Sequence, residues 1–313
     1  MEKKEYQIAA TFGVAAPANL TIQGFVSPSL FTPDLDPNYE FRTDILSDVL
    51  AWLRMGEGEN LFLTGPTGSG KSSIICQVAA RLNLPVQRVT AHGRLEIPEL
   101  VGHYAAVNGN TEFQYGPLAI AMKEGQIFLL DELDLLDPAN TGGLNGIAEG
   151  TPLVIPEKGG EIIRRHPDFR FVVTGNTKGT GDISGNYQGT MKQNISFMDR
   201  FWIVHVDYPE RTDEIGILKS CVPHVPDGMH EKFVDTANEI RALFTNGSYE
   251  TTVDVTMSSR TLIRWANMSV FYQGVAKKGK NPLLHALDRA LLFRSNETSR
   301  QAIQGIVQRV FGF

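Results

Sequence analysis

Short apolar runs alternate with longer amphipathic stretches through the middle of the chain. The runs are rich in β-branched and aromatic side chains and predict strands at 61–64, 86–90, 127–130, 169–174 and 202–206. The stretches between them show the periodicity of helices, beginning with one at 43–55. Because strands covered by helices on both faces are apolar throughout, this alternation predicts an α/β fold with a parallel sheet.

Two other parts of the chain follow different patterns. Residues 1–40 are rich in Pro, Asp and Asn and show little periodicity, so we expect an extended N-terminal lead-in. After Tyr208 the pattern is mainly helical, with candidate helices at 212–220, 230–244, 260–272, 282–293 and 298–311. The predicted organisation is a lead-in at 1–40, an α/β domain at 41–208 and an α-helical domain at 209–313.

The composition is that of a soluble globular protein, with a formal net charge of -6. Constitutive binding of nucleic acid needs clustered Lys and Arg, so the net negative charge argues against it. No stretch approaches the ~20 apolar residues that cross a bilayer, and the two cysteines lie far apart in sequence. The 7 histidines show no metal-ligand spacing, which argues against a zinc site. We therefore expect a cytoplasmic protein with no membrane contact.

A glycine-rich motif follows the first predicted strand. Residues 65–72 fit the pattern G-x-x-x-x-G-K-[ST], between a strand that ends at Thr64 and an amphipathic helix. In such a loop, backbone N–H groups curl around phosphate oxygens at a helix N-terminus. We expect Lys71 to neutralise the β- and γ-phosphates of ATP and the Ser72 hydroxyl to bind Mg²⁺. The predicted nucleotide-binding residues are Gly65, Pro66, Thr67, Gly68, Ser69, Gly70, Lys71, Ser72 and Ser73.

Polar side chains follow two further predicted strands. Asp131 and Glu132 come directly after the run at 127–130, and Asn176 follows the strand at 169–174. The carboxyl ends of parallel strands meet at one edge of the sheet, where open α/β folds bind ligands. We expect Asp131 to bind Mg²⁺ through water, Glu132 to orient and deprotonate the attacking water, and Asn176 to sense the γ-phosphate.

Two arginines are candidates for nucleotide contacts from outside this edge. We expect Arg200, just before the last predicted strand, to cross a subunit boundary and reach a neighbour's γ-phosphate; the alternative is a local ion pair with Asp199. The capped helix start at 258–260 would present Arg260 to nucleotide, with Arg264 one turn later as the competitor. The catalytic candidates are therefore Glu132, Asn176, Arg200 and Arg260.

These motifs, in this order and followed by a helical domain, resemble the MoxR-type branch of AAA+ ATPases, and within it most closely the CobS subunits of aerobic cobaltochelatases. The resemblance extends over nearly the whole chain. Beyond the motifs above it rests on T-F-G-V at 11–14, D-P-N-Y at 36–39, Q-V-A-A-R-L-N at 77–83, E-L-V-G at 99–102, G-D at 181–182, Y-Q-G-T at 187–190 and Q-R-V-F-G at 308–312.

The resemblance implies an AAA+ P-loop NTPase with a five-stranded parallel sheet core and a C-terminal α-helical lid domain. It also implies ATP hydrolysis with Mg²⁺, a homo-oligomeric ring of six subunits, and hairpins inserted near 105–115 and 152–163. The second hairpin agrees with the turn signal at Gly159 and Gly160. Motors of this branch are often paired with a protein that carries a von Willebrand factor A domain.

Three functions are compatible with these features. The first is an ATP-driven motor that remodels or activates a partner protein, and the second is the ATPase subunit of a cobalt- or magnesium-chelatase-like complex. Residues 66, 67 and 69 depart from the chelatase pattern G-Y-H-G-T-G-K-S, so cobalt insertion does not follow from the resemblance alone. The third is a nucleic-acid motor, which the acidic balance disfavours.

Overall fold

The computed structural model describes residues 2–55, 58–182, 187–226, 228–246 and 253–313, and these form two compact units. The first unit comprises Met1–Asp36, Phe41–Pro66 and Lys71–Val206, and the second comprises Pro37–Glu40, Thr67–Gly70 and Asp207–Phe313. We expected the helical domain to begin at 209. The second unit begins its main segment at Asp207 and also takes in the middle of the glycine-rich loop.

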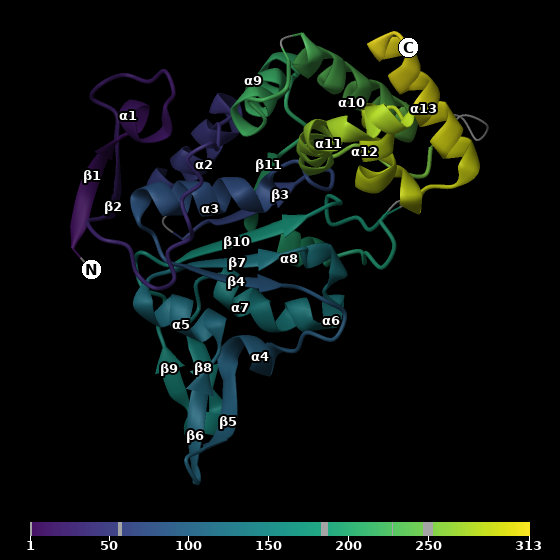
Figure 1. The fold of residues 1–313 in the computed structure, drawn as a ribbon. Coiled ribbons are helices and arrows are strands. Elements are labelled where there is room, and N and C mark those ends of the chain that lie inside the picture. Colours follow the sequence, from purple (N-terminus) through teal and green to yellow (C-terminus); the bar gives the residue numbers. More distant parts are fainter. Residues whose placement is uncertain (1, 56–57, 183–186, 227, 247–252) are drawn as a thin grey trace. The chain divides into compact units, whose positions relative to one another are not determined.

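A five-stranded parallel sheet forms the centre of the first unit (Figure 1). Its strand order is β11 (Phe201–His205), β3 (Asn60–Thr64), β10 (Arg170–Gly175), β7 (Ile127–Asp131) and β4 (Val86–Thr90). Every neighbouring pair is parallel, so all five carboxyl ends lie at one edge. The predicted α/β fold with a five-stranded parallel sheet is confirmed.

Helices cover both faces of this sheet (Figure 1). α2 (Thr43–Met55) and α3 (Lys71–Leu82) lie on one face, and α5 (Pro117–Glu124) and α7 (Asn145–Ala148) lie on the other. All residues of β3 and β7 are buried between the two layers. Burying a large apolar side chain contributes about 1.5–3 kcal/mol, so this core fixes the strand ends that carry the polar motifs. Shorter helices lie in the connections: α4 (Ile97–Val101), α6 (Pro138–Thr141) and α8 (Ile195–Met198).

Both hairpins that the resemblance implied are present. β5 (Gly102–Val107) pairs with β6 (Asn110–Tyr115), and β8 (Leu153–Ile155) pairs with β9 (Glu161–Ile163). The hairpins lie side by side (Figure 1), and the hydroxyl of Tyr115 donates to a carboxylate oxygen at the start of β9 at 2.7 Å. This bond joins the two hairpins below the sheet.

The N-terminal segment differs from the extended lead-in that we expected. β1 (Lys3–Gln7) and β2 (Thr21–Phe25) form an antiparallel pair, with α1 (Ile8–Phe12) between them in the chain. Gly24 packs against the end of α3, where a Cβ would lie 2.4 Å from the carbonyl oxygen of Leu82. β1 is mostly exposed, which explains why its sequence lacks the apolar pattern of the central strands.

The second unit is built from helices around its own core. Phe233 and Trp265 are buried and stack edge to face, with ring centroids 4.5 Å apart. Among the described residues, no helix is both long and apolar enough to cross a membrane. The main helices are α9 (Arg211–Cys221), α10 (Met229–Asn246), α11 (Ser259–Phe271), α12 (Pro282–Ala290) and α13 (Glu297–Phe311).

Candidate functional site

The glycine-rich loop connects β3 to α3. Gly65 has a φ of 150°, and a Cβ there would lie 2.1 Å from the carbonyl oxygen of Val206, so only glycine fits. Lys71 begins α3, and its Nζ donates to the carbonyl oxygens of Gly65 and Pro66 at 2.8 Å and to Oδ1 of Asn176 at 3.0 Å. The loop therefore holds a lysine at a helix N-terminus, where positive charge favours phosphate oxygens.

The middle of the loop, Thr67–Gly70, belongs to the second unit. A Cβ on Gly68 would lie 2.6 Å from Cβ of Ser258, so the loop packs closely on the residue that caps α11. The Ser69 hydroxyl is buried and has no hydrogen-bond partner among the described residues. A buried hydroxyl without a partner costs free energy, and a nucleotide phosphate would supply an acceptor. Ser73, by contrast, is exposed.

Three side chains converge on the carboxylate of Asp131. The Ser72 hydroxyl, on α3, donates to Oδ1 at 2.5 Å. The Thr174 hydroxyl on β10 donates to the same oxygen, and Arg88 on β4 pairs with Oδ2, its Nε at 3.2 Å, while its Nη2 makes a second bond. Neighbouring strands and the loop helix thus meet at one acid.

This oxygen-rich set fits a magnesium ion. Mg²⁺ keeps several waters and binds through one or two carboxylates together with substrate phosphates. Ser72 and Asp131 supply a hydroxyl and a carboxylate within hydrogen-bond distance of each other. Among the described residues there is no cluster of three or more His, Cys, Asp or Glu that could hold a metal. A magnesium ion between Ser72 and Asp131 would take its other ligands from phosphate and water.

Opposing effects set the pKa values of Asp131 and its partner Arg88. Burial raises the pKa of the Asp131 carboxyl, but hydrogen bonds from Ser72, Thr174 and Arg88 outweigh burial and lower the pKa below its usual value. Burial likewise lowers the pKa of Arg88, and the contact with Asp131 raises it overall. Asp131 is therefore ionised at neutral pH and attracts a cation.

Glu132 has an unusual backbone conformation next to Asp131. Its φ of 59° and ψ of 45° lie in the left-handed region, which costs a residue with a side chain about 1–2 kcal/mol. The backbone N–H of Glu132 donates to the Thr174 hydroxyl at 3.0 Å. Strained residues of this kind cluster at functional sites, and Thr174 links the strained peptide to the Asp131 carboxylate.

Asn176 is held in place by a buried acid. Asp134 is 1% exposed and accepts hydrogen bonds from the N–H of Asn176, from the N–H of Thr177 at 2.9 Å and from the Thr177 hydroxyl at 2.8 Å. A Cβ on Gly175 would lie 2.7 Å from Oδ2 of Asp134, so glycine permits this approach. Burial raises the pKa of Asp134 although these bonds oppose it. Asp134 therefore orients the residue that contacts Lys71.

Arg200 lies at the opposite edge of the sheet. It immediately precedes β11, whose first residue, Phe201, pairs with Asn60 at the start of β3. A strand of this length spans about 16 Å, so Arg200 is far from the glycine-rich loop at the end of β3. Its guanidinium pairs with Glu149, Nε at 3.0 Å, whereas the local alternative that we considered was Asp199. Action across a subunit boundary stays a prediction.

Arg260 lies in the second unit, on the first turn of α11. Ser258 caps this helix by accepting a hydrogen bond from the N–H of Thr261 at 3.2 Å, so the expected capped start is present. Arg260 and Arg264 are both exposed. The choice of Arg260 over Arg264 as the nucleotide contact stays a prediction.

Arg88, Thr174 and Asp134 belong to the site although sequence patterns did not single them out. Arg88 is a charged residue near the carboxyl end of a strand, which was the available signal. Asp134 follows the acidic pair in D-E-L-D, but nothing in the sequence distinguishes its buried carboxylate from an exposed one. They form an edge suited to bind nucleotide phosphates, together with Lys71, Ser72, Asp131, Glu132 and Asn176.

Two family models match the chain. Residues 60–201 match the AAA domain (dynein-related subfamily). Residues 214–310 match the CbbQ/NirQ/NorQ C-terminal family. The first match spans the sheet and its polar edge, and the second spans most of the helical unit.

Similar proteins support the same grouping. The chain is 31% identical to the aerobic cobaltochelatase subunit CobS of Sinorhizobium sp, over 97% of this chain and 90% of that protein. It is 25% identical to the uncharacterized protein YojN of Bacillus subtilis (strain 168), over 85% of this chain and 82% of the relative. Among solved structures, a RuvB mutant of Thermotoga maritima has a TM-score of 0.50 and 14% identity over 79% of this chain and 69% of that chain, which shows the fold alone.

Proposed function

Because the chain belongs to the MoxR-type AAA+ ATPases and is close to CobS, we propose that it hydrolyses ATP to ADP and phosphate at the edge formed by the glycine-rich loop, β7 and β10. The observation that carries this proposal is the 2.5 Å hydrogen bond from Ser72 to Asp131, which joins the loop helix to the acidic motif. In a glycine-rich turn that binds no nucleotide, we would not expect the hydroxyl of Ser72 to contact a carboxylate at the end of a different strand.

Each side chain of this edge has a distinct role in the proposed reaction. Lys71 neutralises charge on the terminal phosphates. Ser72 and Asp131 would hold Mg²⁺, which would offset the charge of the phosphate oxygens. Glu132 orients the attacking water and accepts its proton. Asn176, beside Lys71, hydrogen-bonds the γ-phosphate or that water.

We further propose that the subunits form a homo-oligomeric ring, with six as the expected number. Arg200 lies at the edge of the sheet that is remote from its own loop, which supports action on a neighbour's γ-phosphate. In the single subunit Glu149 holds the guanidinium, so transfer to a neighbouring site exchanges one anionic partner for another.

Mixing two inactive variants tests hydrolysis and the trans-acting arginine together. Removing an arginine finger costs about 10³- to 10⁵-fold in rate, so pure Arg200→Ala rings and pure Lys71→Ala rings should both release almost no phosphate. In a random equimolar mixture about a quarter of the interfaces combine an intact loop with an intact arginine, so phosphate release should reappear. Lys123→Ala removes an exposed lysine away from this edge and should release phosphate like the wild type.

Two outcomes contradict different parts of this proposal. If native mass spectrometry detects mixed rings while phosphate release stays at the level of the parents, Arg200 does not act in trans. If the wild-type chain releases no phosphate from ATP in the presence of Mg²⁺, the proposed reaction itself is wrong.

We propose that hydrolysis remodels or activates a partner protein, with a von Willebrand factor A domain protein as the candidate. The joined hairpins β5–β6 and β8–β9 support this by offering a surface away from the nucleotide edge. Tagged Glu132→Gln protein, isolated from its native cells with ATP, should retain the partner, because nucleotide stays bound. Lys71→Ala should not retain it. Equal recovery with both variants would contradict ATP-dependent binding.

A second candidate is the ATPase subunit of a cobalt- or magnesium-chelatase-like complex. The identity of 31% to CobS over 97% of the chain favours it. ATP-dependent insertion of Co²⁺ or Mg²⁺ into a tetrapyrrole by the reconstituted complex would establish this role. Retention of a partner without any such insertion would favour remodelling.

A further inference from the structure

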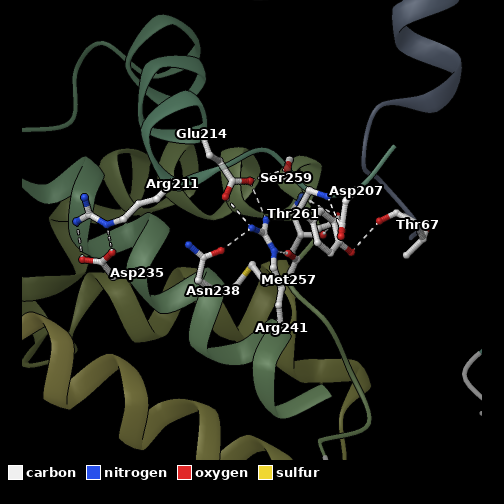
Figure 2. Close-up of polar contacts among 12 residues, drawn as sticks. Thr67, Asp207, Arg211, Glu214, Asp235, Asn238, Arg241, Met257, Ser259 and Thr261 are labelled. Atoms are coloured by element: carbon white, nitrogen blue, oxygen red, sulfur yellow. Dashed lines mark hydrogen bonds and ion pairs between the residues drawn. The ribbon is translucent and has the colours of Figure 1, made fainter. Parts of the chain in front are cut away.

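A buried ion pair lies between two helices of the second unit. Arg241 on α10 donates two parallel hydrogen bonds to Glu214 on α9, each at 2.7 Å, and the side chains are 8% and 1% exposed (Figure 2). The hydroxyl of Ser259 adds a third donor to Glu214 at 2.6 Å. Removing two charges from water is costly, so a buried pair is weak evidence of stabilisation. Its fixed geometry favours a positioning role.

One further bond of Arg241 reaches the start of α11, and another stays within α10. Its Nε donates to the carbonyl oxygen of Met257 at 2.7 Å, and Nη1 donates to Asn238 at 3.0 Å (Figure 2). Met257 directly precedes Ser258, the residue that caps α11. Together with the bond from Ser259 to Glu214, these contacts fix both sides of the helix cap. The helix that presents Arg260 is therefore positioned by the ion pair.

The same guanidinium also reaches the glycine-rich loop through one aromatic ring. It lies over the ring of Tyr208, 4.1 Å from the centroid, a cation–π contact. The Tyr208 hydroxyl donates to the carbonyl oxygen of Thr67 at 3.0 Å. On the next loop residue, Gly68, there is no room for a Cβ beside Ser258. The loop is thus attached to the cap of α11 directly at Gly68 and through Tyr208 and Arg241.

We propose that Tyr208, Arg241 and Glu214 form a positioning relay that holds the phosphate-binding loop and the first turn of α11 in one arrangement. This inference rests on the proposed function, and it adds that ATP affinity depends on residues that act through the Thr67 peptide. The three residues are positioning residues: Tyr208 acts on the loop, Arg241 orients Tyr208, and Glu214 orients Arg241.

Tyr208→Phe is the most informative variant, because it removes the bond to Thr67 and keeps the ring under Arg241. The lost bond is exposed, so the Tm should not change. The KM for ATP, and the Kd of a fluorescent ATP analogue, should rise about 3- to 10-fold, the value of one hydrogen bond, with kcat nearly unchanged. A purely structural role would not separate KM from Tm in this way.

Tyr272→Phe is the matched control. Tyr272 lies in the same unit at the C-terminal end of α11, whereas the loop packs on Ser258 at the start of that helix. The guanidinium of Arg289 lies 5.5 Å from the centroid of the Tyr272 ring. Like Tyr208→Phe, this variant removes one tyrosine hydroxyl, but it should leave the KM for ATP unchanged. An equal rise in KM for both tyrosine variants would overturn the relay.

Arg241→Lys tests whether Arg241 acts through Tyr208. Lysine keeps the charge but loses the planar fork and the stacking. ATP affinity should fall, and combining it with Tyr208→Phe should give little further loss, because both changes break one path. Multiplicative effects would overturn the relay. If Arg241→Lys does not fold, Ser259→Ala, which removes only the hydroxyl bond to Glu214, takes its place in the same cycle with the same expected result.

The binding titration separates this inference from the proposed function. A wild-type chain that binds the ATP analogue in a Tyr208-dependent way but releases no phosphate supports the relay and contradicts hydrolysis. A wild-type chain that hydrolyses ATP, with the same KM and Kd after Tyr208→Phe, supports hydrolysis and overturns the relay.

Discussion

The nucleotide edge of the first unit and the interior of the second each contain an arginine–carboxylate pair, but the surroundings of the two pairs differ. Arg88 is 51% exposed and its partner Asp131 9%, whereas Arg241 and Glu214 are 8% and 1% exposed. Asp131 shares its oxygens among an arginine and the hydroxyls of Ser72 and Thr174. Glu214 binds one bidentate guanidinium with both oxygens and also accepts a bond from the Ser259 hydroxyl.

The two pairs therefore differ in how readily they can exchange partners. At Asp131, water reaches the partly exposed Arg88. A cation and its bound waters can replace the hydrogen-bond donors of the Asp131 carboxylate. Glu214 and Arg241 are almost fully buried, so little water can compensate a broken bond and loss of either partner leaves a buried charge. We therefore expect Asp131 and Arg88 to serve catalysis, and Glu214 and Arg241 to position the helices. Substitutions in the first pair should change mainly turnover, and substitutions in the second mainly stability.

Glu214→Gln should have the largest effect on stability. It leaves Arg241 buried without a negative partner, and breaking such a pair costs about 3–5 kcal/mol, so the Tm and the urea midpoint should fall clearly. Asp235→Asn is the control, because Asp235 pairs with Arg211 between the same two helices at the exposed surface (Figure 2). It should leave unfolding unchanged. A similar loss in both variants would remove the distinction between buried and exposed pairs.

Asp131→Asn should have the next largest effect, on turnover rather than on folding. The amide keeps the size of the side chain but loses the charge that holds the cation. Residues that bind or orient a metal typically account for 10- to 100-fold, so phosphate release should fall by about that factor with little change in Tm. A large fall in Tm with full turnover by the folded fraction would mean that Asp131 is structural like Glu214.

Arg88→Gln should have the smallest effect, and one that depends on pH. Its pair with Asp131 contributes about 1 kcal/mol to unfolding free energy at pH 7. Because the pKa of Asp131 is lowered in the folded state, its contribution is complete above the unfolded value of about 3.9 and is lost as the pH falls through the lower folded value. Urea unfolding should therefore show a constant difference from pH 7 to about 5 that shrinks below about 4. A difference that grows towards acid would contradict this sign.

The sheet and its motifs could be predicted because local sequence determines them. Buried parallel strands are continuous apolar runs, and Asp131, Glu132 and Asn176 each directly follow such a run, so one pattern located both strand and site. The N-terminal pair β1–β2 was missed because β1 is exposed and its sequence carries no apolar alternation.

Contacts between residues far apart in the chain were not predictable in the same way. Asp134 and Asn176, or Glu214 and Arg241, meet only because of how the elements pack, and a single sequence does not report which acid faces which base. The sequence does not show which acidic side chains are buried. Burial distinguishes an acid that holds a loop or helix in place from one that is solvated. Arg200 illustrates the same limit, because its partner is Glu149 and not its sequence neighbour.

The most direct test of the account is phosphate release by Glu132→Gln beside the wild type, at saturating ATP and Mg²⁺, with binding of a fluorescent ATP analogue measured on the same samples. The amide keeps the shape of the side chain and removes the base, and general-base catalysis contributes about 10²- to 10⁴-fold. We predict that binding is retained and that release falls by this factor. Release at the wild-type rate would contradict the assignment of Glu132 and, with it, the proposed site of hydrolysis.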